Sequence, residues 1–142
     1  MKLFLDTSSL IKLYHEERGT DETDRIFEDF VITRIFLSEI TKIEFSSAIW
    51  KKVRTEELIS SEAVELIDSF ISDYPKFSFV EIDSSLIIHS RDLISKYGTK
   101  GLRTLDSMQL ASIIKIKDDV AFVVTADNLL KSIVNEEGIE CK

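Results

Sequence analysis

Four acidic residues stand at the ends of apolar runs or inside an apolar helical pattern, where carboxylates can bind a divalent cation. They are Asp6, Glu44, Asp106 and Asp127. Asp6 ends the apolar run that begins at Leu3, and Asp127 ends a second apolar run over 121–126. If the fold brings these carboxylates together, they form a set of hard oxygen ligands, and such sets bind divalent cations.

Each acid also has an ordinary structural explanation. Aspartate is a favoured N-cap, worth about 1 kcal/mol, and Asp6, Asp106 and Asp127 all stand at predicted helix starts. Glu44 could pair with a nearby lysine, Lys51 or Lys52. Convergence changes the balance, because two carboxylates about 5 Å apart repel by about 3 kcal/mol at an effective dielectric constant of about 20. A cluster therefore predicts either a bound cation or a raised carboxyl pKa.

Short apolar runs alternate with longer amphipathic segments, which is typical of β/α units around a mostly parallel sheet. The sequence predicts strands near 2–5, 35–38, 77–82 and 121–125, and a short fifth strand at 139–142. It predicts helices over 7–15, 20–30, 38–54, 60–75, 84–97, 105–117 and 127–136. Ligands of open α/β sheets bind beyond the carboxyl ends of the strands. Acids that follow the first and fourth strands therefore share a crevice if those strands are neighbours.

The composition favours one domain over residues 1–142 in a reducing, cytoplasmic setting. One proline and four glycines leave no flexible linker, and the single cysteine excludes an intrachain disulfide. Asp6 cuts the first apolar run too short for a signal peptide, and no stretch approaches the roughly 18 apolar residues of a membrane helix. The net charge of −8 opposes non-specific nucleic-acid binding, although basic clusters lie at 51–54 and 96–103.

With these residues identified, the chain resembles the PIN-domain ribonucleases, most closely the VapC-type toxins of bacterial and archaeal toxin–antitoxin modules. Four segments carry the resemblance, in order and at suitable spacing: 5–11, 41–45, 101–111 and 124–127. Each motif alone is common, whereas the ordered set is specific and covers essentially the whole chain. One departure is Gln109, which stands where many relatives have histidine.

The resemblance implies a three-layer α/β/α sandwich whose mostly parallel sheet has about five strands in the order 3-2-1-4-5. It implies that the four acids are catalytic and bind Mg²⁺ or Mn²⁺, with Ser8 and Thr125 close to the metal site. The expected activity is metal-dependent hydrolysis of RNA phosphodiester bonds, and the expected partners are RNA, a cognate antitoxin and a second copy of the chain. Arg103 or a nearby lysine would hold the scissile phosphate, although taken alone Arg103 favours a structural salt bridge.

Other functions stay open at this point. A non-catalytic PIN-fold module that binds protein or RNA would have the same fold. A haloacid-dehalogenase-type phosphotransferase would need a second aspartate at position 8, which is serine, and a receiver-like phosphoacceptor would need an acidic pair before its nucleophile strand. Cleavage through the RNA 2′-hydroxyl would need a general base and acid, for which the chain offers only His15 and His89.

Overall fold

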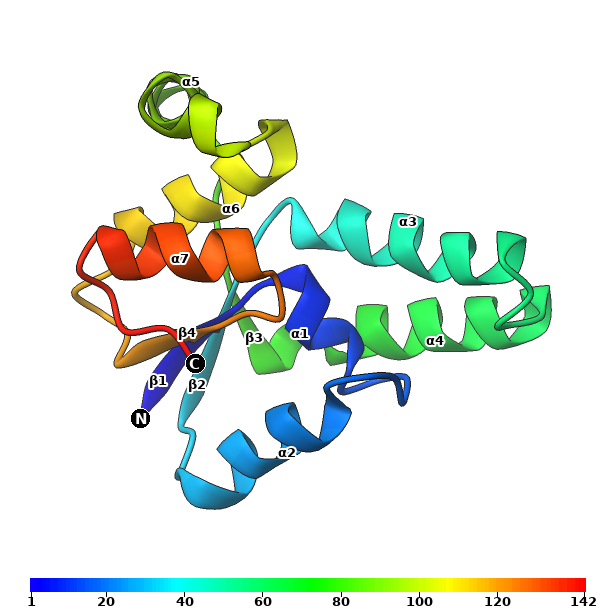
Figure 1. Cartoon of the computed structure of the whole chain (residues 1–142). Helices are drawn as coiled ribbons and strands as arrows, with labels where there is room; N and C mark the ends of the chain where they lie inside the picture. The colour runs from blue at the N-terminus through cyan, green and yellow to red at the C-terminus, as the bar shows by residue number, and fades with distance from the viewer.

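Four parallel strands form the centre of the fold in the order β3-β2-β1-β4, and helices cover both faces of the sheet (Figure 1). The computed structural model describes all 142 residues. The strands are β1 (Lys2–Leu5), β2 (Arg34–Ser38), β3 (Phe77–Val80) and β4 (Phe122–Val124). The helices are α1 (Thr7–Ile11), α2 (Thr20–Asp29), α3 (Thr41–Arg54), α4 (Ser60–Asp73), α5 (Ser84–Tyr97), α6 (Thr104–Lys115) and α7 (Asn128–Glu136).

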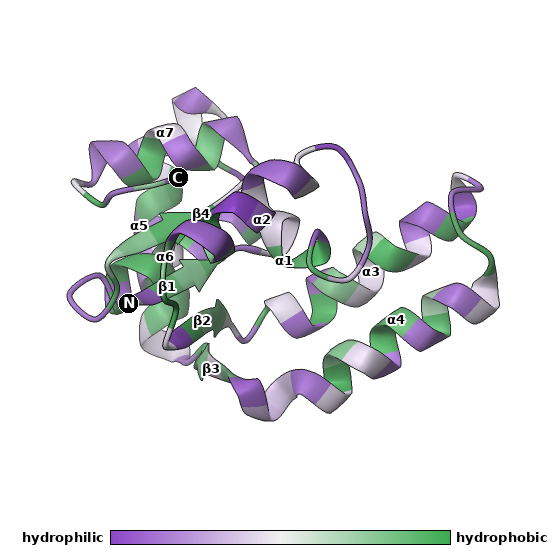
Figure 2. Cartoon of the chain, turned by 90° about the horizontal axis from the view of Figure 1, so that it is seen from below, coloured by the Kyte–Doolittle hydropathy of each residue, from purple (hydrophilic) through white to green (hydrophobic).

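The strands are apolar on both faces because each face packs against helices. Leu3 and Leu5 enter one hydrophobic core with residues of α1, α3 and α4, whereas Phe4 enters a second core with residues of α5, α6 and α7. The hydropathy colouring shows the strands as the most continuously apolar part of the chain (Figure 2). These two cores confirm the three-layer α/β/α arrangement expected from the sequence.

The strand order reverses beside β1. The chain passes from β1 to β2 and β3 on one side, and β4 then pairs with β1 on its other side. Leu5 lies opposite Val124 in this pairing, so the carboxyl ends of β1 and β4 are adjacent. Such a switch point opens a crevice beyond the strand ends. The residues that follow these two strands, Asp6 and Thr125, therefore lie side by side.

Several element boundaries differ from the predicted ones. The predicted fifth strand is reduced to one parallel bridge between Val123 and Cys141. The first helix ends at Ile11 rather than at residue 15, because tighter i to i+3 hydrogen bonds such as Leu13 N–H to the Leu10 carbonyl replace the helical ladder. The third helix begins at Thr41, because Ser38 belongs to β2. No helix is both long and apolar enough to cross a lipid bilayer.

The remaining helices match their predicted spans to within about two residues, which is the usual uncertainty of helix ends. Asp83 caps α5 by accepting a hydrogen bond from the Leu86 N–H at 2.8 Å. Pro75 lies in a 3₁₀ turn over Tyr74–Lys76 directly after α4, where its ring prevents the helix from continuing.

Candidate active site

Asp6 lies at the carboxyl end of β1 and is held by three hydrogen bonds. It is only 4% exposed and caps α1, so its Oδ1 accepts the Ser9 N–H at 3.0 Å and the Ser8 hydroxyl at 2.7 Å. Its Oδ2 accepts the Thr125 hydroxyl. The Ser8 hydroxyl also accepts the Ala126 N–H at 3.1 Å. Ser8 and Thr125 thus bind the Asp6 carboxylate to the segment that follows β4.

Asp127 lies on that same segment. It caps α7 by accepting the Leu130 N–H on Oδ1 at 3.0 Å, and its own N–H donates to the Thr125 hydroxyl oxygen at 3.0 Å. One hydroxyl, that of Thr125, therefore contacts both Asp6 and Asp127. The capping explanation is correct for these two aspartates, and capping does not use the second carboxylate oxygen of Asp127.

Glu44 reaches the same region from the first turn of α3. Its Oε1 accepts hydrogen bonds from the Thr7 hydroxyl at 3.1 Å and from the Gln109 amide at 2.7 Å. The alternative that Glu44 pairs with a lysine is wrong: neither Lys51 nor Lys52 forms an ion pair with it, and Lys52 pairs instead with Glu17 and Glu57. The contacts of Glu44 join α1, α3 and α6.

Asp106 lies in the first turn of α6, where Arg103 rather than Asp106 is the N-cap residue. The capping explanation is therefore wrong for Asp106, because the residue lies three positions inside the helix and its carboxylate accepts no hydrogen bond. Arg103 is exposed and forms no ion pair, so the salt bridge expected for it is absent. The Arg103 charge nevertheless acts on Asp106 and lowers its pKa, although burial and Asp127 raise that pKa more.

Mutual repulsion shows that the four acids are electrostatic neighbours. The pKa of Asp6, of Glu44 and of Asp106 is raised above its ordinary value, with burial as the largest cause in each case. The charge of Asp127 further raises the pKa of Asp6 and of Asp106. The charges of Asp6 and Asp106 do the same to Glu44. The four acids that the sequence singled out come from four different elements, and each interacts electrostatically with at least one of the others.

Comparison with known proteins identifies the family. A model of the family described as "PIN domain" matches residues 3–135. The chain belongs to the PIN-domain family. It is 30% identical over 132 residues to Ribonuclease VapC35 of Mycobacterium tuberculosis, an alignment that covers 91% of this chain and 87% of that protein.

Solved structures share the fold of this PIN domain. The crystal structure of VapC20 of Mycobacterium tuberculosis, a toxin that cleaves the sarcin–ricin loop, matches with a TM-score of 0.71 at 13% identity and covers 92% of this chain and 94% of its own. The VapBC-1 structure from nontypeable Haemophilus influenzae matches with a TM-score of 0.64 at 14% identity, covering 100% and 97%. At these identities the matches show the shared architecture.

The donor chemistry of this PIN domain suits a hard divalent cation. Both oxygens of Asp106, Oδ2 of Asp127 and Oε2 of Glu44 accept no hydrogen bond from the protein, so each is available as a ligand. The spacing is looser than a coordination sphere, since no three His, Cys, Asp or Glu side chains are placed to hold one metal ion. Cation binding would therefore require these carboxylates to move closer together.

A polar network behind Glu44 is the part of the site that sequence reasoning missed. Gln109 is 3% exposed, and its amide nitrogen contacts the Thr7 hydroxyl at 3.1 Å and the Thr41 hydroxyl at 3.0 Å as well as Glu44. A spacing signal exists: Thr41 precedes Glu44 by three residues and Gln109 follows Asp106 by three. Each pair therefore shares one face of its helix.

Proposed function

We propose that this chain is a metal-dependent endoribonuclease and the toxin of a toxin–antitoxin pair, acting in the cytoplasm. One observation carries the proposal: four acids, three of them with unused carboxylate oxygens, are electrostatic neighbours at the strand switch point of a PIN domain. The name of the relative at 30% identity, Ribonuclease VapC35, supports RNA as the substrate.

Asp6, Glu44, Asp106 and Asp127 would hold one or two Mg²⁺ or Mn²⁺ ions. A bound ion of this kind supplies positive charge for the phosphate and lowers the pKa of bound water for attack on the phosphodiester. The protein's own contribution is to fix the ligands. Asp6 is oriented by Ser8 and Thr125 through the hydrogen bonds given above.

Other side chains would orient Glu44, bind the cation and contact the phosphate. Gln109 and Thr7 occupy Oε1 of Glu44, which leaves Oε2 directed to other partners. Asp106 and Asp127 keep free oxygens for a cation or for the hydration shell that Mg²⁺ retains. Arg103 is exposed, forms no ion pair and acts electrostatically on Asp106, so it is available to contact the scissile phosphate.

We also propose a cognate antitoxin and a homodimer. Solved structures of similar fold include VapBC-1 and a toxin–antitoxin complex from Klebsiella pneumoniae, the latter with a TM-score of 0.62 at 18% identity. An antitoxin segment that carries a cation over the acidic crevice would relieve the same repulsion that a metal ion relieves. Light scattering measures the molar mass of each assembly: the chain alone tests the homodimer, and the chain co-expressed with the product of a neighbouring gene tests the antitoxin complex.

A non-catalytic PIN module is the second candidate, and one observation favours it: the acids are not gathered tightly enough to coordinate one ion. A module of this kind would bind protein or RNA without cutting it. The two functions differ in two measurements, Mn²⁺ binding by calorimetry and RNA cleavage. The first function requires both, and the second requires neither.

The decisive experiment is cleavage of varied RNAs by the purified protein with Mg²⁺ or Mn²⁺ and with EDTA. Asp6→Asn and Asp106→Asn should abolish cleavage, while Asp83→Asn is the matched control. Asp83 is also an aspartate at a helix start, but it pairs with Lys115 at the far end of α6 from Asp106. The products should carry a 5′-phosphate and a 3′-hydroxyl. A 2′,3′-cyclic phosphate, or activity that survives EDTA, would refute the metal-dependent route.

A further inference from the structure

A cavity of about 620 Å³ opens beside the segment that follows β4. It lies between the segment after β4, the loop before α2 and the helix α7, and it is lined by Thr125 and Ala126 among others. These two residues also contact the Asp6 site, because the Thr125 hydroxyl donates to Asp6 and the Ala126 N–H donates to Ser8. The cavity and the crevice are therefore two sides of one short segment. We name this cavity the Arg18 cavity.

The Arg18 cavity is basic in a chain that is otherwise strongly acidic. Its lining includes four cationic side chains, Lys12, Arg18, Lys131 and Lys142, against the single acid Glu22. The net charge of the whole chain is −8. Lys12 and Lys142 already pair with carboxylates of the chain. Arg18 and Lys131 form no ion pair, which leaves two free cations facing the same space.

The loop that carries Arg18 is held firmly in place. Glu17 accepts ion-pair contacts from Lys12 at 2.9 Å and from Lys52 at 2.6 Å, and the Lys12 side chain is only 7% exposed. Gly19 follows with a left-handed φ of +91°, and a Cβ there would lie 2.8 Å from the Lys12 Cε. The backbone on both sides of Arg18 is thereby fixed, so the wall of the Arg18 cavity is preformed.

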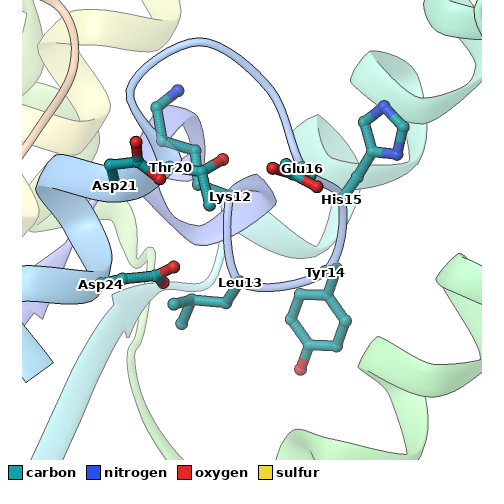
Figure 3. A pocket seen from close by; sticks show the side chains of 8 residues that line it. All are labelled: Lys12, Leu13, Tyr14, His15, Glu16, Thr20, Asp21 and Asp24. Carbon is teal, nitrogen blue, oxygen red and sulfur yellow. The ribbon is translucent and has the colours of Figure 1, made fainter.

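A second cavity next to the same loop has the opposite charge character. Its volume is about 440 Å³, and Lys12, Glu16, Asp21 and Asp24 are among its lining residues (Figure 3). Its three carboxylates would repel a phosphate. Of the two cavities, only the basic one is lined by Thr125 and Ala126, which contact Asp6 and Ser8.

Electrostatics also connect the Arg18 cavity to the crevice. Burial is the main reason that the pKa of Cys141 is raised to about 11, with Lys131 lowering that pKa and Asp6 raising it. The charges of Lys131, which lines the cavity, and of Asp6 therefore both act on this one thiol.

We propose that the Arg18 cavity binds the backbone phosphate of single-stranded RNA next to the bond held at the acidic crevice, with Arg18 and Lys131 as its contacts. This proposal rests on the proposed ribonuclease function. It gives an acidic protein a local means of holding a polyanion, since affinity for phosphates comes from positioned Lys and Arg side chains. In this arrangement one flank of the bound RNA passes over Ala126 toward α7.

The test is the salt dependence of RNA binding, measured in EDTA so that the RNA stays intact. The probe is fluorescently labelled oligouridylate, which forms no internal pairs, and binding is followed by fluorescence anisotropy. In the double variant Arg18→Ala/Lys131→Ala, the slope of log Kd against log salt concentration should become less steep by about 1.4, which is about 0.7 for each lost phosphate contact on a single strand.

Two further variants separate charge from fold. Arg18→Lys/Lys131→Arg keeps both cations and should retain the wild-type slope. Lys117→Ala is the matched control, since Lys117 is also exposed and unpaired but lies before β4, at the amino ends of the parallel strands. It should change neither slope nor affinity. Because Arg18 and Lys131 form no ion pair, the double variant should melt at the wild-type temperature, which verifies that it is folded.

Cleavage measured in parallel with Mn²⁺ separates this proposal from the ribonuclease itself. Cleavage by wild type together with an unchanged slope in Arg18→Ala/Lys131→Ala would overturn the Arg18 cavity and leave the nuclease standing, with an acidic protein segment as the cavity's other candidate occupant. A reduced slope without any cleavage would support the cavity and overturn the nuclease. If wild type neither binds the probe nor cuts RNA, both proposals fail.

Discussion

Replacing Gln109 by glutamate tests the geometry of the site most directly. The substitution keeps the size and shape of the side chain but puts a second carboxylate where the amide now donates to Glu44 Oε1 at 2.7 Å. The position is buried, so water cannot screen the two charges well. The protein must either accept the repulsion or keep a proton on the pair.

The two costs can be compared. Two unit charges 2.7 Å apart repel by about 6 kcal/mol at an effective dielectric constant of about 20. Keeping a proton at pH 7 on a carboxyl group of ordinary pKa about 4.3 costs about 2.7 units at about 1.36 kcal/mol each, or about 3.7 kcal/mol. Protonation is the cheaper response, and the proton belongs to the pair rather than to either residue. A protonated carboxyl group can also donate to its neighbour as the amide does.

The Gln109→Glu variant should lose stability as the pH rises. Between about pH 5 and pH 8 the folded variant holds one proton that the unfolded chain releases, so its stability relative to wild type falls by about 1.4 kcal/mol per pH unit. Urea denaturation in EDTA across this range measures the difference. Near the ordinary glutamate pKa the variant should be almost as stable as wild type.

Gln109→Met is the uncharged control. It removes the donor to the Glu44 carboxylate and should cost about 1.5–3 kcal/mol at every pH, because hydrogen bonds to charged groups have this worth. Parallel curves for Gln109→Glu and wild type across the pH range would refute the reasoning. Such a result would mean that Glu44 and residue 109 do not contact each other in the folded protein.

Three further predictions concern the surroundings of the site. Gly19→Ala should lower the free energy of unfolding in urea by about 1–3 kcal/mol, because its φ is +91° and its Cβ would meet the Lys12 side chain at 2.8 Å. Gly138→Ala is the control, since Gly138 has φ +77° and open space around it, and it should cost only about 1 kcal/mol. Equal losses in the two variants would argue against the Lys12 clash. Burial is the main reason that the pKa of the Cys141 thiol is raised from 9.0 to about 11. Near pH 8 this thiol should therefore react with a disulfide reagent about 100-fold more slowly than the same thiol in the urea-unfolded chain. A ratio of the two rates near one would show that the thiol is accessible. Burial raises the pKa of Glu17, but hydrogen bonds from its two lysine partners outweigh burial and lower it below 4.5, so the stability from this cluster should be lost as the pH falls below that value. Glu17→Gln should therefore cost about 3 kcal/mol at neutral pH and flatten the acid limb of the stability curve, whereas an unchanged acid limb would contradict the pairing.

The architecture could be predicted because its causes are local. Leu3, Phe4 and Leu5 are apolar in succession, and a strand buried on both faces by helices requires such a run. The predicted fifth strand at 139–142 was wrong in extent for the opposite reason. The tail does pair with β4, since backbone hydrogen bonds join Glu140 and Lys142 to Val123, but its single bridge, between Val123 and Cys141, is too short to count as a strand, and the local pattern does not predict how far such a pairing extends.

The positions of the acids could be predicted, but their partners could not. Asp6 and Asp127 follow strands, so a general rule about strand ends places them in the crevice. The contacts that orient them come from distant segments: Thr125 is 119 residues from Asp6, and Gln109 is 65 residues from Glu44. Helical periodicity indicates which face carries a polar residue, but not which of several polar side chains it will meet.

The four acids also differ in how many hydrogen bonds hold their carboxylates, and therefore in how easily each side chain can reorganise. Asp6, Glu44 and Asp127 each accept hydrogen bonds that fix at least one oxygen, whereas Asp106 accepts none and is restrained only by repulsion and by the charge of Arg103. Because the acids must move closer together to hold an ion, the side chain without hydrogen bonds, Asp106, can reorganise most easily, and its repulsion from Asp127 is relieved when a cation arrives. The loose spacing of the acids and the donor set suited to a cation are therefore compatible properties of one site.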